Sequence, residues 1–155
     1  MTSPYDLMVK LQGVRNSILD ETENIIYRNE NKIIQLNSSQ IEQHIGFDNK
    51  QLVNTDPLFN GIYSKSHFTE SGGFHLAGTP YDFTNSGNFF SYFYVEVLPN
   101  LVQIEIGSTG TGSGDKDRFF RGYSNIFGLN SQNQYKLNYE IILPELQKFV
   151  KQQLG

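Results

Sequence analysis

Three histidines are present, and two of them lie near a glutamate in a pattern that could bind a metal ion. His67 and His75 flank Glu70 and a Gly72-Gly73 turn, whereas His44 stands apart. Imidazole and carboxylate groups are ordinary zinc ligands, so this group would suit a small metal-dependent hydrolase. The spacing matches no established ligand pattern, however. We therefore expect no metal ligand, no catalytic residue and no cofactor-binding residue.

A second chemical possibility is a phosphate-binding loop in the glycine-rich residues 107–116. That motif requires G-x-x-x-x-G-K followed by Ser or Thr, with the lysine directly after a glycine. Here Asp115 precedes Lys116 and Asp117 follows it, and two carboxylates would repel a phosphate group. Ser86 does not lie in the G-x-S-x-G turn of a nucleophilic serine either. The sequence predicts that the protein is not an enzyme.

Bulk composition argues against several further classes of function. The net charge of -4 and the pI of about 5.3 provide no basic surface for nucleic acid. No segment approaches a membrane span, and the N-terminus lacks a signal-peptide pattern. The absence of cysteine favours a reducing compartment. Charged residues are only 18%, and the 14% of aromatic residues are all Phe and Tyr, which favours a surface that contacts other proteins.

Helical spacing is found at both ends of the chain. Ser3 is a favourable N-cap and Pro4 a favourable first helical residue, so a helix is predicted over about residues 4–30. A C-terminal helix is predicted over about residues 131–153, with Ser131 as its cap. Pro144 lies within it and should kink or restart the helix, because proline lacks an N–H and clashes with the preceding turn.

Two alternating apolar runs predict a β-hairpin over about residues 92–107. The runs are Tyr94–Leu98 and Leu101–Ile106, joined by Pro99-Asn100. The expected fold is α+β, with an antiparallel sheet packed against the N-terminal and C-terminal helices in a single domain over residues 1–155.

Shorter segments carry weaker signals. Lys32–Leu36 is apolar and β-branched and predicts a strand, whereas Asn37–Gln40 predicts a turn or a single helical turn. Gly46–Lys50 predicts a turn that closes a small hairpin onto Ile33 and Ile34.

The irregular residues 50–80 have no clear period. They are interpreted either as an arm that becomes ordered against a neighbouring subunit or as a surface loop over the sheet. Residues 107–114 predict a flexible loop, and Asp115–Arg121 predicts a short helix after it.

Several short segments follow one another in a characteristic order along the chain. They are Asn60–Ser64, Gly78–Phe83, Asn85–Phe90, the hairpin ending at Ile106, and Ile126–Asn130 before the last helix. This order resembles small structural proteins of phages that infect Bacteroidetes, and more distantly the virion-morphogenesis, neck and tail-completion proteins of tailed phages. Those proteins carry G-x-P-x-D-L-x-x-T-G-D-F, then two strands, then I-F-G-L. This chain differs at Ser86 and Asn88, where the pattern has Thr and Asp.

The resemblance implies a structural virion protein at the head–tail junction, neck or tail-tube end. Such a protein would be a head–tail connector or tail-completion component, made and assembled in the bacterial host cytoplasm. Its partners would be copies of itself in a ring and other phage structural proteins, with no membrane and no sequence-specific nucleic acid. The residues alone leave open two alternatives, a monomeric binding module for glycan or protein that uses surface aromatics, and the small metal-dependent hydrolase.

Overall fold

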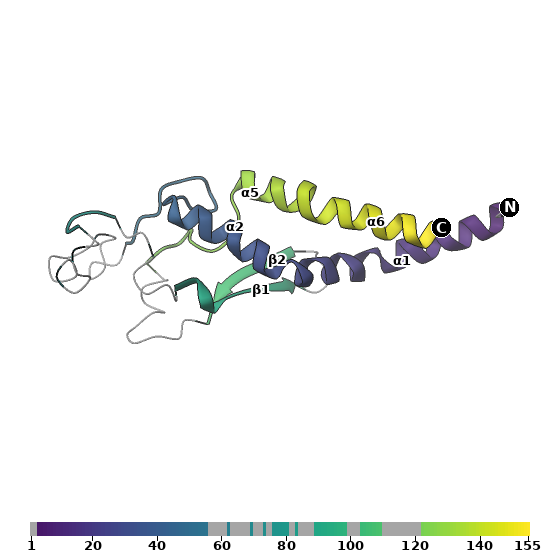
Figure 1. Ribbon diagram of the computed structural model, residues 1–155, viewed down its shortest axis with the longest axis horizontal. Helices are drawn as coiled ribbons and strands as arrows, with labels where there is room; N and C mark the ends of the chain where they lie inside the picture. Colours follow the sequence, from purple (N-terminus) through teal and green to yellow (C-terminus); the bar gives the residue numbers. More distant parts are fainter. Residues whose placement is uncertain are drawn as a thin grey trace.

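In the computed structural model, the described residues are 3–55, 62, 69, 73, 76–80, 83, 89–98, 103–109 and 122–155. They form an elongated molecule in which two long helices extend as an arm from a body containing the hairpin (Figure 1). Both chain ends lie towards the outer end of this arm. The α+β class is confirmed. The elements are α1 (Pro4–Arg28), α2 (Glu30–Glu42), η1 (Phe89–Tyr92), β1 (Phe93–Leu98), β2 (Gln103–Ser108), α5 (Ser131–Tyr135), the π-helical η2 (Lys136–Ile142) and α6 (Leu143–Leu154).

The predicted start of the N-terminal helix is confirmed. The Ser3 hydroxyl accepts a hydrogen bond from the Asp6 backbone N–H at 3.1 Å, and the Asp6 carboxylate accepts one from the Ser3 backbone N–H at 3.1 Å. This reciprocal capping box satisfies donors that the first helical turn leaves free. The helix ends at Arg28, two residues before the predicted limit, and Asn29 separates it from α2.

The predicted strand at Lys32–Leu36 is wrong, because these residues lie inside α2. Asn37–Gln40, predicted as a turn or a single helical turn, is helical but belongs to the longer helix α2. Burial at Ile33, Asn37 and Ile41 recurs every four residues, which is the period of one helix face. Amide residues on that face resemble turn formers in sequence, but here their partners lie elsewhere in the chain.

Gly46–Lys50 does form the predicted turn, but its hairpin closes on itself. The Gly46 N–H donates to the Lys50 carbonyl at 2.8 Å, and Ile45 and Gln51 form an isolated antiparallel bridge. The predicted pairing with Ile33 and Ile34 is wrong, because both residues belong to α2.

The hairpin is present, with β1 and β2 antiparallel and Phe93 opposite Ser108. The second strand ends at Ser108, two residues after the end of the predicted run, and residues 99–102 lie outside the described part of the chain. Phe93, Val95 and Ile106 are buried and pack in one core cluster with residues of α1 and α2. Alternation therefore places one face of the hairpin on the helices.

The C-terminal helix is capped one residue earlier than predicted. The Asn130 side chain accepts from the Asn133 N–H at 2.9 Å, so Asn130 is the N-cap and Ser131 is the first helical residue. Pro144 lies in the first turn of α6, directly after the π-helical η2. The predicted restart is confirmed, since the wider π turn precedes the residue that cannot donate a helical hydrogen bond.

Candidate interaction surfaces

The residues first considered for chemistry lie mostly outside the described part of the chain. This is true of His67, Glu70 and His75, of Ser86, and of the predicted helix over residues 115–121. Of the flexible loop predicted over residues 107–114, residues 110–114 also lie outside it, whereas Gly107 and Ser108 belong to β2 and not to a loop. Most of the irregular residues 56–75 lie outside it too. Within the described ranges, no group of three or more His, Cys, Asp or Glu side chains is placed to hold a metal ion. No helix among them is long and apolar enough to span a bilayer.

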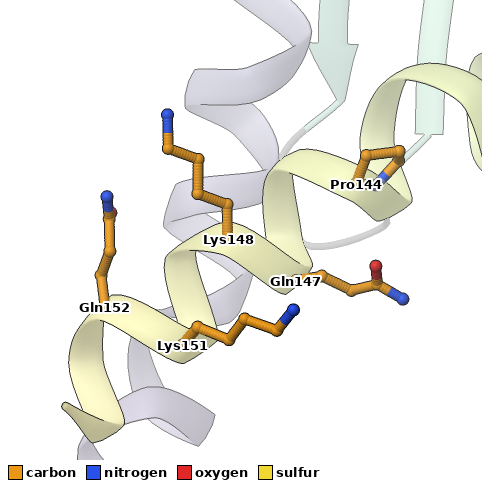
Figure 2. Close-up of a pocket in the computed structure, with 5 residues that line it drawn as sticks. All are labelled: Pro144, Gln147, Lys148, Lys151 and Gln152. Atoms are coloured by element: carbon orange, nitrogen blue, oxygen red, sulfur yellow. The ribbon is translucent and has the colours of Figure 1, made fainter.

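One shallow depression lies on the outer, polar side of α6. Pro144, Gln147, Lys148, Lys151 and Gln152 line it. Figure 2 shows that Lys148 and Gln152 point one way and Gln147 and Lys151 another, so these polar groups do not converge on a common point. The depression is therefore a basic helix surface and not an enclosed site.

The body contains a network of buried amides that connects α2 to the loop before α5. The Asn37 amide nitrogen Nδ2 donates to the carbonyls of Ile126 at 3.2 Å and Gly128 at 2.8 Å. The Gln40 nitrogen Nε2 donates to the same Gly128 carbonyl at 3.1 Å. Loop carbonyls that would otherwise be buried without donors are thereby satisfied.

The same glutamine also holds the start of the C-terminal helix. Its oxygen Oε1 accepts from the Asn130 N–H at 2.8 Å and from Asn133 Nδ2 at 3.3 Å, and Asn133 Nδ2 also donates to the Leu36 carbonyl at 2.9 Å. Gln40 is only 2% exposed. Because buried amides are favourable only when paired, this network fixes the loop in one position against α2.

The fixed loop forms one wall of an apolar groove of about 660 Å³. Other walls come from α1, β2 and η2. Buried or partly buried side chains form its base, and these include Ile26, Ile104, Ile106, Phe127, Leu137 and Ile142. The exposed amides Gln103, Gln134 and Asn138 lie at its edge, and none of the lining residues that the structure describes is charged. A groove of this kind suits an apolar partner segment better than a charged ligand.

The two helices of the arm are joined by polar contacts near both ends. At the inner end, Asn29 Nδ2 donates to one Glu145 carboxylate oxygen at 2.7 Å and Arg28 donates to the other at 3.1 Å. These contacts, with Asn29 contributing most, lower the pKa of the Glu145 carboxyl below its ordinary value. At the outer end, Lys10 Nζ donates to the Leu154 carbonyl at 3.3 Å.

Between these contacts the two helices of the arm contain few buried residues. No residue of α6 is buried, and the first buried residue of α1 is Val14. The turns of α1 that precede Lys10 lie beyond the last turn of α6, as Figure 1 shows for the N-terminal end. Five large apolar side chains in and next to these turns are exposed, namely Tyr5, Leu7, Met8, Val9 and Leu11.

Three of these side chains form a row. Leu7, Met8 and Leu11 are 45%, 56% and 49% exposed, and their spacing places them along one side of the helix. Val9, which is 52% exposed, and the charged Lys10 fall on other sides of the helix. We refer to Leu7, Met8 and Leu11 as the tip row.

A second aromatic surface lies near the groove. The rings of Tyr135 and Tyr139 are 4.6 Å apart at their centroids and both side chains are exposed. This pair is the described feature that best matches the expected surface aromatics. Both residues lie within the predicted C-terminal helix, and their exposure could not be predicted from the sequence.

Comparison with protein-family models, with curated proteins and with solved structures finds no match to this chain. Two features of the structure that were not predicted, the buried amides and the tip row, do have signals in the sequence. Amides at Asn37 and Gln40 share the helical face of Ile33, and apolar residues surround several sides of the helix between Tyr5 and Leu11.

Proposed function

We propose that the protein is a structural virion protein of a tailed phage and acts by assembling with copies of itself. The observation that carries the assembly part is the exposed tip row on an arm whose second helix has no buried residue. Contiguous apolar surface of this kind marks interaction sites in soluble proteins. The placement at a head–tail junction, neck or tail-tube end is supported by the order of the sequence segments that resemble phage structural proteins.

The energy available from one tip is modest. Fully burying a leucine or methionine is worth about 1.5–3 kcal/mol, and the tip row is already about half buried, so complete burial adds about 1 kcal/mol per side chain. About 3 kcal/mol is far from the roughly 8 kcal/mol of a micromolar complex. Assembly would therefore depend on further contacts and on their repetition in a closed ring.

The proposed partners are copies of this chain and the connector or tail proteins next to them. The proposed location is the virion, with assembly in the host cytoplasm. No catalytic role is proposed. The metal-dependent hydrolase depends on His67, Glu70 and His75, and the described residues add no support for it.

The test compares two neighbouring substitutions by light scattering coupled to size-exclusion chromatography, with negative-stain images of each sample. Met8→Lys places a charge in the tip row, whereas Val9→Lys places the same charge on another side of the same turn, at a residue of similar exposure. We expect wild type and Val9→Lys to assemble at similar concentrations and Met8→Lys to need at least about tenfold more protein, which corresponds to a loss of about 1.4 kcal/mol.

A wild-type protein that stays monomeric at every concentration, and also in the presence of its virion neighbours, would overturn the proposal. The genes beside its own provide a second check. Portal, capsid and tail genes are expected there, and their absence would remove the phage assignment while leaving self-assembly to be judged by the scattering data.

The exposed Tyr135 and Tyr139 pair favours one alternative, a monomeric binding module for glycan or protein. Stacked aromatic side chains offer flat apolar area with polar ends. Calorimetry or a glycan array would support this alternative if the monomer bound a glycan and Tyr139→Ala abolished the binding without loss of helix content.

A further inference from the structure

We propose that the free edge of β2, the side of the strand that faces away from β1, binds an extended segment of another protein as a third strand of the hairpin. We call this side the β2 edge. The site goes beyond the proposed function, since it would bind such a segment whether or not copies of this chain assemble. Three features support it, namely the direction of the backbone groups, the difference between the two edges of the hairpin, and the space beside β2.

The hydrogen-bond pattern of the hairpin determines which backbone groups point outward. The Thr109 N–H donates to the Tyr92 carbonyl at 3.0 Å, so these two residues form a hydrogen-bonded pair. In an antiparallel ladder such pairs alternate with pairs that exchange no hydrogen bond. By this alternation and the register of the strands, Ile104 and Ile106 belong to pairs of the second kind. Their N–H and C=O groups therefore point away from β1.

The two edges of the hairpin differ in what engages them. On the β1 side, the Val95 N–H donates to the Glu30 carboxylate at 3.1 Å, as the alternation requires, and β1 contacts α2 and α1. On the β2 edge, the outward backbone groups of Ile104 and Ile106 have no hydrogen-bond partner among the described residues. A strand edge with such groups is a template for pairing with another strand.

The apolar groove runs beside the β2 edge. Gln103, Ile104 and Ile106 all line it, although successive side chains of a strand point to opposite faces of the sheet. Residues from both faces border one space when that space lies along the edge of the strand and not over one face. The groove of about 660 Å³ therefore offers room next to the outward backbone groups.

The groove and the β2 edge together specify an extended and uncharged occupant. The outward groups of Ile104 and Ile106 are two residues apart, about 7 Å along the strand, which is the spacing at which an extended chain presents its own N–H and C=O groups. A helix offers no such groups, because its backbone bonds internally. Since the described lining residues are uncharged, side chains that face Ile26 and Leu137 should be apolar. The expected segment alternates apolar residues with residues of any kind.

Strand β2 of a second copy does not fit this site. The groove is also lined by Ile26 of α1 and Leu137 of η2, and Ile106 is only 5% exposed, so the β2 edge is recessed between these elements. The same strand of another copy is recessed in the same way, and two recessed edges cannot approach to the distance of about 4.8 Å at which strands pair. A single extended segment without helices beside it can enter.

The test uses the full-length chain and a displayed library of random peptides of about ten residues, the upper range of strand length. We expect selection on the immobilised protein to enrich peptides with apolar, uncharged residues at alternate positions. The most enriched peptide is then titrated by fluorescence anisotropy against wild type and two variants. Enrichment no greater than on an uncoated surface would overturn the proposal.

Ile104→Pro and Val97→Pro are a matched pair of variants. The two residues lie opposite each other, both are partly buried, and each N–H points away from the neighbouring strand, so proline leaves the hydrogen bonds between β1 and β2 in place. Only Ile104→Pro removes a donor from the β2 edge. We expect it to weaken peptide binding at least about tenfold, and Val97→Pro to change it by less than about threefold. Equal losses from the two variants would contradict the assigned edge.

Hydrogen exchange in the wild-type protein tests the same site without a substitution. Saturating peptide should slow exchange of the Ile104 and Ile106 N–H groups at least about tenfold, because the peptide would then bond to this edge. The N–H groups of Glu105 and Gly107 point towards β1 and should change much less. Peptide binding without protection of Ile104 and Ile106 would place the peptide elsewhere and would refute the third-strand contact.

Discussion

The buried amide network predicts that Gln40 is one of the most sensitive positions in the body of the protein. Replacing it by leucine keeps a similar volume but removes both polar groups. The Asn130 N–H then loses its acceptor, the Gln40 oxygen Oε1 at 2.8 Å, at the first turn of the C-terminal helix. A buried donor left in this state retains the full cost of desolvation.

The other two groups that Gln40 contacts are partly protected. The Gly128 carbonyl keeps its hydrogen bond from Asn37 at 2.8 Å, and Asn133 Nδ2 keeps its hydrogen bond to the Leu36 carbonyl. Leaving the Asn130 N–H without an acceptor costs about 1–3 kcal/mol. The hydrogen bonds that the Gly128 carbonyl and Asn133 Nδ2 lose add to this cost, and burial of the apolar leucine side chain offsets part of the total. We expect Gln40→Leu to lower the free energy of unfolding by about 2–3 kcal/mol.

The measurement is urea unfolding followed by circular dichroism, with thermal melts as a second readout. A loss of 2–3 kcal/mol corresponds to a fall in Tm of about 4–12 °C for a chain of this size. The control is Gln35→Leu, the same change at an exposed position of the same helix, expected to stay within about 0.5 kcal/mol of wild type. Equal stability of the two variants would refute the view that the amides fix the loop against α2.

Three further substitutions test the space around two glycines and the pH dependence of the Glu145 contacts. Gly13→Ala should raise the free energy of unfolding by about 0.5–1 kcal/mol, because Gly13 lies within α1 and an added Cβ meets nothing within 4 Å. Gly46→Ala should lower the free energy of unfolding, because the added Cβ would lie 2.7 Å from the Asn125 carbonyl oxygen and would overlap the Asn125 side chain. Urea unfolding should therefore show changes of opposite sign for the two glycine variants. Glu145→Gln should lower Tm at about pH 7, where the carboxylate is ionised and bound by Asn29 and Arg28. Because the pKa of Glu145 is lowered in the folded state, this contribution is present above the ordinary pKa of 4.5 and is lost as pH falls through the lowered pKa. The difference in Tm between the two proteins should therefore shrink as the pH is lowered through this range, and a constant difference would contradict the assigned contacts.

Features with local causes could be predicted from the sequence. The start of α1 follows from Ser3, Pro4 and Asp6, which act within one turn, and the restart before α6 follows from Pro144. The hairpin follows from alternation between neighbouring residues. These signals do not depend on what packs against them.

Helix α2 could not be predicted in the same way, because its decisive contacts are far away in the chain. Gln40 bonds to a carbonyl that is 88 residues distant, and Asn37 bonds to one that is 91 residues distant. A local pattern assigns such residues to turns, since their side chains usually bond to nearby backbone. Only the folded loop before α5 makes them favourable inside a helix.

The groove could not be predicted either, because its lining comes from four separate parts of the chain. The tip row was visible only as an excess of apolar residues near the N-terminus. Its exposure depends on where α6 ends relative to α1, which the contact between Lys10 and Leu154 defines.

The polar groups buried in the body and the apolar groups exposed on the arm would contribute to assembly in different ways. A loop held by amides presents one fixed wall of the groove, because any shift would leave carbonyls unpaired. The arm leaves large apolar side chains of α1 exposed, and contact with another molecule would bury them further. Under the proposed function, the arm supplies part of the free energy of association, and further contacts repeated between copies supply the rest. A closed ring requires the same geometry in every copy, so the contacts of Glu145 with Asn29 and Arg28, which join α6 to the junction between α1 and α2, matter to the geometry of the assembly as well as to the stability of one chain.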